Sequence, residues 1–80
     1  MNSIVYKVYN RNDVPRGNES TCTVITLPYG DGTINQFIII PSLEDNPILH
    51  SHIANWCGTR DGRITSDDME AEMHRFQSTR

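Results

Sequence analysis

A hairpin signal in the middle of the chain places the strongest constraint on its fold. Residues 21–41 read TCTVITLPYGDGTINQFIIIP, two apolar runs rich in β-branched residues that flank an Asp-Gly pair at Asp31 and Gly32. Asp-Gly between such runs is typical of a two-residue β-hairpin turn. With this turn, three cross-strand pairs are predicted: Thr26 with Phe37, Ile25 with Ile38 and Val24 with Ile39.

The second run of the hairpin, residues 34–40, is apolar on both faces. One face carries Ile34, Ile38 and Ile40, and the other carries Phe37 and Ile39. A strand covered on one side only should alternate apolar and polar residues. We therefore expect either that this strand lies inside the sheet or that its second face meets a partner, because a bare apolar edge would promote aggregation.

A third strand is predicted before the hairpin. Residues 4–9 are rich in β-branched and aromatic side chains, with Ile4, Tyr6 and Val8 on one face and Lys7 on the wetter face. The polar connection that follows, residues 10–20, contains Asn, Asp, Pro, Gly and Ser, which favour turns. The N-terminal half is therefore expected to form a three-stranded, mainly antiparallel sheet.

Two helices are predicted after the hairpin. Asn46 followed by Pro47 is typical of a helix start, with Asn as the N-cap and Pro in the first helical position, and Gly58 is a suitable end. The expected apolar stripe of this helix consists of Ile48, Leu49, Ile53, Trp56 and Cys57.

The second helix is expected to start near Thr65. Thr65 and Asp68 resemble a capping box, and Ile64 with Met69 matches a hydrophobic staple. Its buried stripe is predicted to contain Met69, Met73 and Phe76, and Trp56 and Phe76 are expected to anchor the helices in the core. The fold class is thus α+β, a single domain over residues 1–80 with both helices packed on one face of the sheet.

Charge is distributed unevenly along the chain. Residues 1–40 contain three basic and three acidic side chains, whereas residues 41–80 contain four arginines and seven carboxylates, so the net charge of −3 lies in the second half. This balance argues against nucleic acid or an anionic membrane as the main ligand and favours a basic protein partner. The residues predicted to bind that partner are Asp67, Asp68, Glu70 and Glu72 of the last helix, with Arg11 and Arg16 in the connection 10–20. The simpler interpretation of the carboxylates is compensation of the helix dipole.

The region around Gly62 resembles the second half of an EF-hand, with Gly62, Ile64 and Asp68 at loop positions 6, 8 and 12. Positions 1 and 3 fall on Cys57 and Thr59, where calcium requires hard oxygen ligands. Zinc-type ligands are also present, but their spacing matches no zinc motif; they are His50, His52, Cys57 and His74. No metal and no cofactor are predicted.

Enzymatic activity is not predicted. Cys57 with His50 or His52 has the right residue types for nucleophilic catalysis, but no nucleophile elbow, phosphate loop or dinucleotide fingerprint accompanies them. Two cysteines are too few for a disulfide framework, and a bridge between Cys22 and Cys57 is left open. With no apolar leader and no run long enough to span a membrane, a cytoplasmic location is expected.

These features favour a small acidic protein-binding module. In size, acidity and lack of a catalytic motif the chain is similar to small phage-encoded inhibitors, the anti-CRISPR class among them, a similarity of general character without matched residues. It implies inhibition of a basic, nucleic-acid-handling protein. The alternatives are a structural homodimer through the strand 34–40 and a degenerate EF-hand-like helix–loop–helix that binds an ion.

Overall fold

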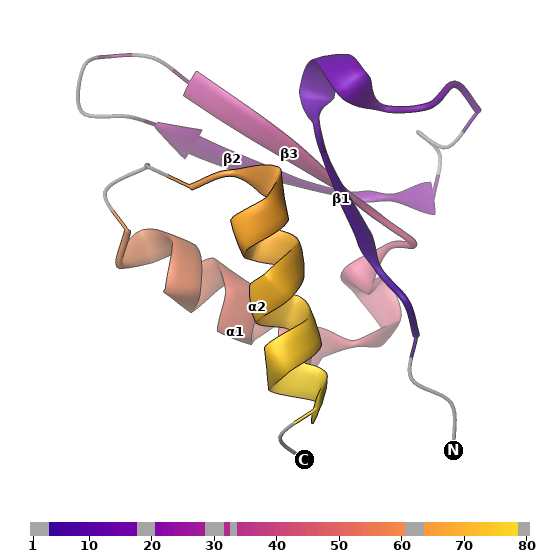
Figure 1. Ribbon diagram of the computed structural model, residues 1–80, viewed down its shortest axis with the longest axis vertical. Coiled ribbons are helices and arrows are strands. Elements are labelled where there is room, and N and C mark those ends of the chain that lie inside the picture. The colour runs from indigo at the N-terminus through magenta and orange to yellow at the C-terminus, as the bar shows by residue number, and fades with distance from the viewer. Residues whose placement is uncertain (1–3, 18–20, 29–31, 33, 61–63, 79–80) are drawn as a thin grey trace.

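The computed structural model describes residues 4–17, 21–28, 32, 34–60 and 64–78. Its elements are the strands β1 (Lys7–Asn10), β2 (Thr23–Pro28) and β3 (Ile34–Ile40), the short 3₁₀ helices η1 (Arg11–Asp13) and η3 (Leu43–Asp45), and the helices α1 (Pro47–Gly58) and α2 (Ser66–Ser78). Both helices lie on the same side of the antiparallel sheet (Figure 1). The predicted α+β class and element order are confirmed.

The strand that is apolar on both faces is the central one. The sheet order is β1-β3-β2, and β3 pairs antiparallel with both neighbours. The first of the two expectations for this strand is therefore confirmed. Between Phe37 and Ile39 both edges of β3 are paired, so along these residues a homodimer would have to use the outward face of the strand rather than backbone pairing.

The predicted hairpin register is wrong by one residue. Thr26 lies opposite Gln36 rather than Phe37, and the remaining pairs shift with it: Ile25 with Phe37 and Val24 with Ile38. The ladder closes at Pro28 and Ile34, so five residues connect the strands, and Asp31 of the predicted turn lies outside the described residues. A one-residue slip exchanges the two faces of a strand. The observed register directs Ile25 and Leu27 toward the core, whereas the predicted one would have directed Thr26 there.

The core lies between the sheet and the two helices. Its fully buried side chains come from every layer: Phe37, Ile39, Leu43, Leu49, Ile53, Met69 and Met73. Trp56 and Phe76 pack against this cluster but remain partly exposed, so they border the core instead of anchoring it. Ile48, predicted as part of the stripe of α1, is 63% exposed because it points about 100° away from Leu49 on the helix.

Both helix starts form as predicted. Asn46 Oδ1 accepts a hydrogen bond from the Leu49 N–H at 3.3 Å, with Pro47 in the first turn of α1. Thr65 N–H donates to Asp68 Oδ2 at 3.3 Å, and Asp68 N–H donates to Thr65 Oγ1 at 3.1 Å, which completes a reciprocal capping box. The Thr65–Asp68 capping box fixes the residue at which α2 begins, and so the directions in which its polar side chains point.

Three further sequence expectations concern a disulfide bridge, metal binding and a membrane span. Cys22 and Cys57 are not joined in a disulfide. Within the described ranges, no group of three His, Cys, Asp or Glu side chains is arranged to hold a metal ion, and Gly62 of the EF-hand-like segment lies outside those ranges. No helix in the described part of the chain is long and apolar enough to cross a membrane.

Candidate functional site

A groove of about 410 Å³ runs between α2 and the segment that leads into β1. This segment and α2 lie side by side, although they are more than sixty residues apart in the sequence (Figure 1). Ile4, Val5 and Tyr6 line one wall, and the other wall is formed by residues of α2 from Asp67 to Ser78. The groove therefore depends on the docking of the last helix against the first strand.

The groove has an apolar part that remains open to solvent. Ile4 is 48% exposed and Val5 is 74% exposed, whereas Met73 forms a buried contact below them. Ala71 adds a small side chain to the α2 wall. Exposed aliphatic side chains that gather beside a groove are typical of binding surfaces.

Two of the predicted partner-binding carboxylates line the same groove. Asp67 is exposed, and Glu70 is half-buried with Oε2 accepting a hydrogen bond from the Val8 N–H at 2.9 Å. Both residues lie off the predicted buried stripe of Met69, Met73 and Phe76, which predicts that both side chains face solvent; this holds for Asp67 and is wrong for Glu70. The helix period alone could not show that β1 presents a free backbone N–H to Glu70.

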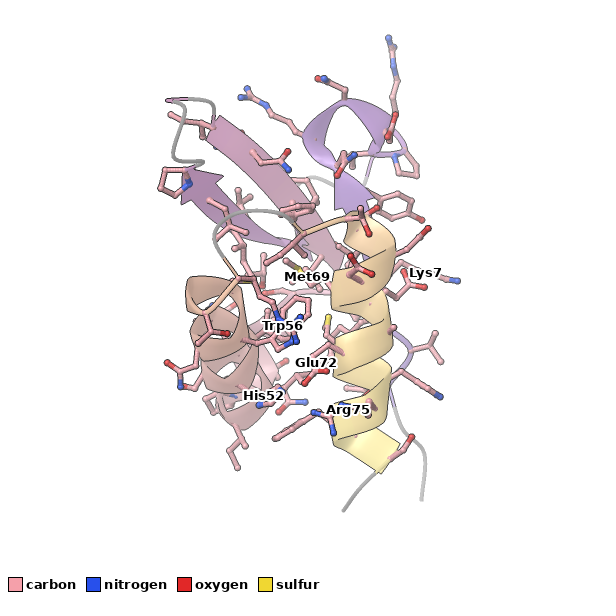
Figure 2. The ribbon with its side chains drawn as sticks, turned by 60° about the vertical axis from the view of Figure 1, so that its left-hand side comes forward. Lys7, His52, Trp56, Met69, Glu72 and Arg75 are labelled. Atoms are coloured by element: carbon pink, nitrogen blue, oxygen red, sulfur yellow. The ribbon has the colours of Figure 1, made fainter. Side chains whose placement is uncertain are left out.

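Glu72 faces the opposite side of α2, toward α1. Its side chain is only 11% exposed and accepts hydrogen bonds from His52 Nε2 at 2.7 Å and from Arg75 Nη2 at 2.7 Å and Nε at 3.0 Å. Figure 2 shows His52, Glu72 and Arg75 together between the two helices, with Lys7 beyond the other side of α2. Hydrogen bonds from Arg75, with a smaller contribution from His52, lower the pKa of the Glu72 carboxyl from 4.5 to about 2 despite its burial.

The four carboxylates of α2 do not form one acidic ridge. Asp67 and Glu70 face the groove, Glu72 faces α1, and Asp68 closes the capping box. Residues five apart on a helix differ by about 140° in direction, which separates Asp67 from Glu72. The structure thus divides the predicted set, and partner binding by each of the four stays a prediction.

Arg11 and Arg16, the other predicted partner-binding residues, do not line the groove. Arg11 Nη1 donates to Gln36 Oε1 at 2.9 Å, and Gln36 Nε2 donates to Thr26 Oγ1 at 3.2 Å, so Arg11 lies over the outward face of the sheet. Arg16 is exposed in the connection after η1. The structure does not bring these arginines together with Asp67 and Glu70.

A ring contact also joins the helices: His52 of α1 stacks on Phe76 of α2 with ring centroids 4.1 Å apart. The Arg60 guanidinium lies 4.9 Å from the centroid of the Trp56 ring, four residues earlier at the end of α1, and so does not link the two helices. Sequence reasoning missed the His52–Glu72 pair because it joins residues twenty positions apart. The only signal in the sequence was that a histidine and a glutamate each lie in the second turn of their predicted helix.

Cys57 is unsuited to the nucleophilic role considered from the sequence. Its side chain is buried in the core, and burial raises the pKa of the thiol from 9.0 to about 11. The thiolate is the nucleophilic form, so at neutral pH this cysteine behaves as a small apolar residue. What the arrangement offers chemically is a groove that combines aliphatic surface with two carboxylates.

The fold and the groove define a small α+β protein with a groove between its last helix and the segment that leads into its first strand. A scan of protein-family models, a search of curated proteins and a search of solved structures each found no match to this chain. The function is therefore argued from the geometry of this groove.

Proposed function

We propose that this chain is a non-enzymatic protein-binding module that binds a basic segment of a partner protein in the groove between residues 4–6 and α2. The observation that carries the proposal is that Asp67 and Glu70 line the same groove as the exposed Ile4 and Val5. A narrower form of the same proposal is that the chain inhibits a basic, nucleic-acid-handling protein. It rests on the net charge of −3, which lies in residues 41–80.

The chemistry of the groove fits lysine and arginine side chains. These residues pack their aliphatic stems on apolar surface while the charged group reaches a polar partner. Ile4 and Val5 supply the apolar surface, and Asp67 supplies an exposed carboxylate. Complementary charge mainly raises the association rate and the specificity, and the apolar contact supplies affinity.

Selection from a random peptide library displayed on phage tests the proposal. The wild-type chain serves as bait, and the selected peptides are then measured against two double variants that each remove two negative charges. Asp67→Asn with Glu70→Gln alters the groove, whereas Glu44→Gln with Asp45→Asn alters exposed carboxylates of η3 outside it.

We expect the selected peptides to combine Lys or Arg with aliphatic residues. They should bind wild type and the η3 variant with equal affinity. They should bind the groove variant about tenfold more weakly, because it loses two partly exposed ion pairs with the peptide. Circular dichroism confirms that both variants fold. Equal binding to the two double variants would show that the groove carboxylates do not recognise the ligand.

The outward face of the sheet supports a second candidate, the homodimer. On that face Ile38 of β3 lies opposite Val24 of β2 and is already buried, whereas Val24 is 52% exposed and Ile34 is 64% exposed. A second copy packed face to face would cover these side chains. Light scattering at high micromolar concentration decides this: a monomer mass of about 9.1 kDa contradicts the homodimer.

A further inference from the structure

We propose that the basic segment binds as a β-strand added to the outer edge of β1, where its backbone carbonyl takes the place of the Glu70 carboxylate on the Val8 N–H. The released carboxylate then pairs with a Lys or Arg side chain of the same segment. This inference rests on the proposed function and adds the conformation of the ligand and the exchange of hydrogen bonds that admits it.

β1 is an edge strand whose outer side faces α2. Among the residues that the structure describes, it pairs only with β3, and Val8 lies opposite Ile39 in that ladder. Because the Val8 N–H donates to Glu70 instead of to β3, its backbone polar groups point toward the groove. Tyr6 precedes β1, and continuation of the alternation of an antiparallel strand by two residues would turn its N–H and C=O to the same side.

Glu70 occupies the position that a neighbouring strand would fill. The distance of 2.9 Å from Val8 N to Glu70 Oε2 equals that of a backbone N–H···O bond between strands. A charged side chain at a strand edge also discourages unwanted pairing. Exchange of one oxygen acceptor for another leaves the Val8 N–H bonded, and the carboxylate becomes available for a cation.

The spacing of groups along the groove is compatible with an extended ligand. Glu70 and Met73 are three residues apart on α2, about 4.5 Å along the helix axis, and two residues of a strand span about 6.6 Å, a difference that the side chains can bridge. A strand that places its cation at Glu70 therefore places the side chain two positions away beside Met73 and Ile4. The expected ligand has a basic and an aliphatic residue two positions apart.

A synthetic peptide tests this geometry directly. The probe is acetyl-Thr-Lys-Thr-Val-Thr-Lys-Thr-amide, which presents Lys, Val and Lys on one face in either strand direction. Two further versions carry N-methyl groups on alternate residues, one version on the odd positions and one on the even positions. Binding is measured by calorimetry, and amide hydrogen exchange of Tyr6 and Val8 is followed by NMR.

A strand added to one edge uses the N–H groups of only one alternate set. We expect one N-methylated version to bind at least about tenfold more weakly and the other to bind as the parent, since each lost backbone hydrogen bond costs about fivefold. Peptide saturation should slow exchange of the Tyr6 amide. Glu70→Gln, which keeps an acceptor for Val8 and loses the charge, should weaken binding about fivefold, whereas Glu44→Gln should not.

Two outcomes separate this inference from the function on which it rests. If the parent and both N-methylated peptides bind equally and Tyr6 exchange is unchanged, the groove binds basic peptides but strand addition is wrong. If Glu70→Gln and Glu44→Gln behave alike while one N-methylated version still fails, strand addition holds and the role of the acidic groove is wrong. No binding of the parent peptide at millimolar concentration overturns the inference, and the peptides selected by display then test the groove alone.

Discussion

Replacement of Glu72 by Gln removes the charge that joins α1 and α2 while it keeps the size of the side chain. A carboxyl whose pKa falls from 4.5 in the unfolded chain to about 2 in the folded chain corresponds to roughly 3 kcal/mol, at about 1.4 kcal/mol per factor of ten. The main partner, Arg75, is 61% exposed, so solvent screens the pair. We therefore expect Glu72→Gln to lower the free energy of unfolding by about 1–2 kcal/mol at pH 7.

The pH dependence follows from the direction of the Glu72 shift. Because the folded-state pKa is lowered, the stabilisation is fully present above about pH 4.5, the unfolded value, and is lost as the pH falls toward 2. The difference between wild type and Glu72→Gln should thus be constant from pH 5 to 7 and shrink below pH 4.5. Urea denaturation at several pH values measures this difference, with Glu44→Gln as the control. A difference that stays the same down to pH 2 would refute the argument.

Three further predictions follow from the core, the cap and the thiols. Met69→Ala should destabilise the fold by about 2–5 kcal/mol in thermal or urea denaturation, because Met69 is fully buried where α2 meets the core. Thr65→Ala should cost about 1 kcal/mol in the same assay through loss of one half of the capping box, while Thr21→Ala at an exposed position outside that box should cost less. Cys57 should react with a thiol reagent at pH 8 only at the rate of unfolding, because burial raises its pKa to about 11; rapid labelling of Cys57 in the folded protein would contradict this.

Local signals in the sequence were sufficient for most of the fold. The caps at Asn46 and Thr65 were predictable because each uses side chains within three residues of one another. The central place of β3 was one of the two expectations drawn from its two apolar faces, the other being a partner on its second face. The caps are decided by neighbours in the chain, whereas the choice between these two expectations required the structure.

The register and the groove required contacts between distant segments. The Asp-Gly pair favoured a two-residue turn, but the partial burial of Ile25, opposite Phe37, and of Leu27, opposite Asn35, decided the register instead. Glu70 and Val8 are 62 residues apart, and no local pattern predicts that this carboxylate bonds to the backbone of the first strand. The sequence therefore showed which carboxylates α2 carries, but not that they face different sides of the helix or that two of them line a groove beside residues 4–6.

The sheet order also sets the sequence in which the fold can assemble. β1 is made first but pairs only with β3, and its other edge bonds to α2, which is made last. The β2–β3 hairpin needs only a short loop closure and is expected to form early, whereas β1 must wait for contacts of long sequence separation. Pulsed hydrogen exchange should protect β3 amides before the Val8 amide, and the reverse order would contradict this route. During synthesis, β1 would then remain an unpaired, aggregation-prone segment until β3 has emerged, and its outer edge would stay uncovered until α2 has emerged.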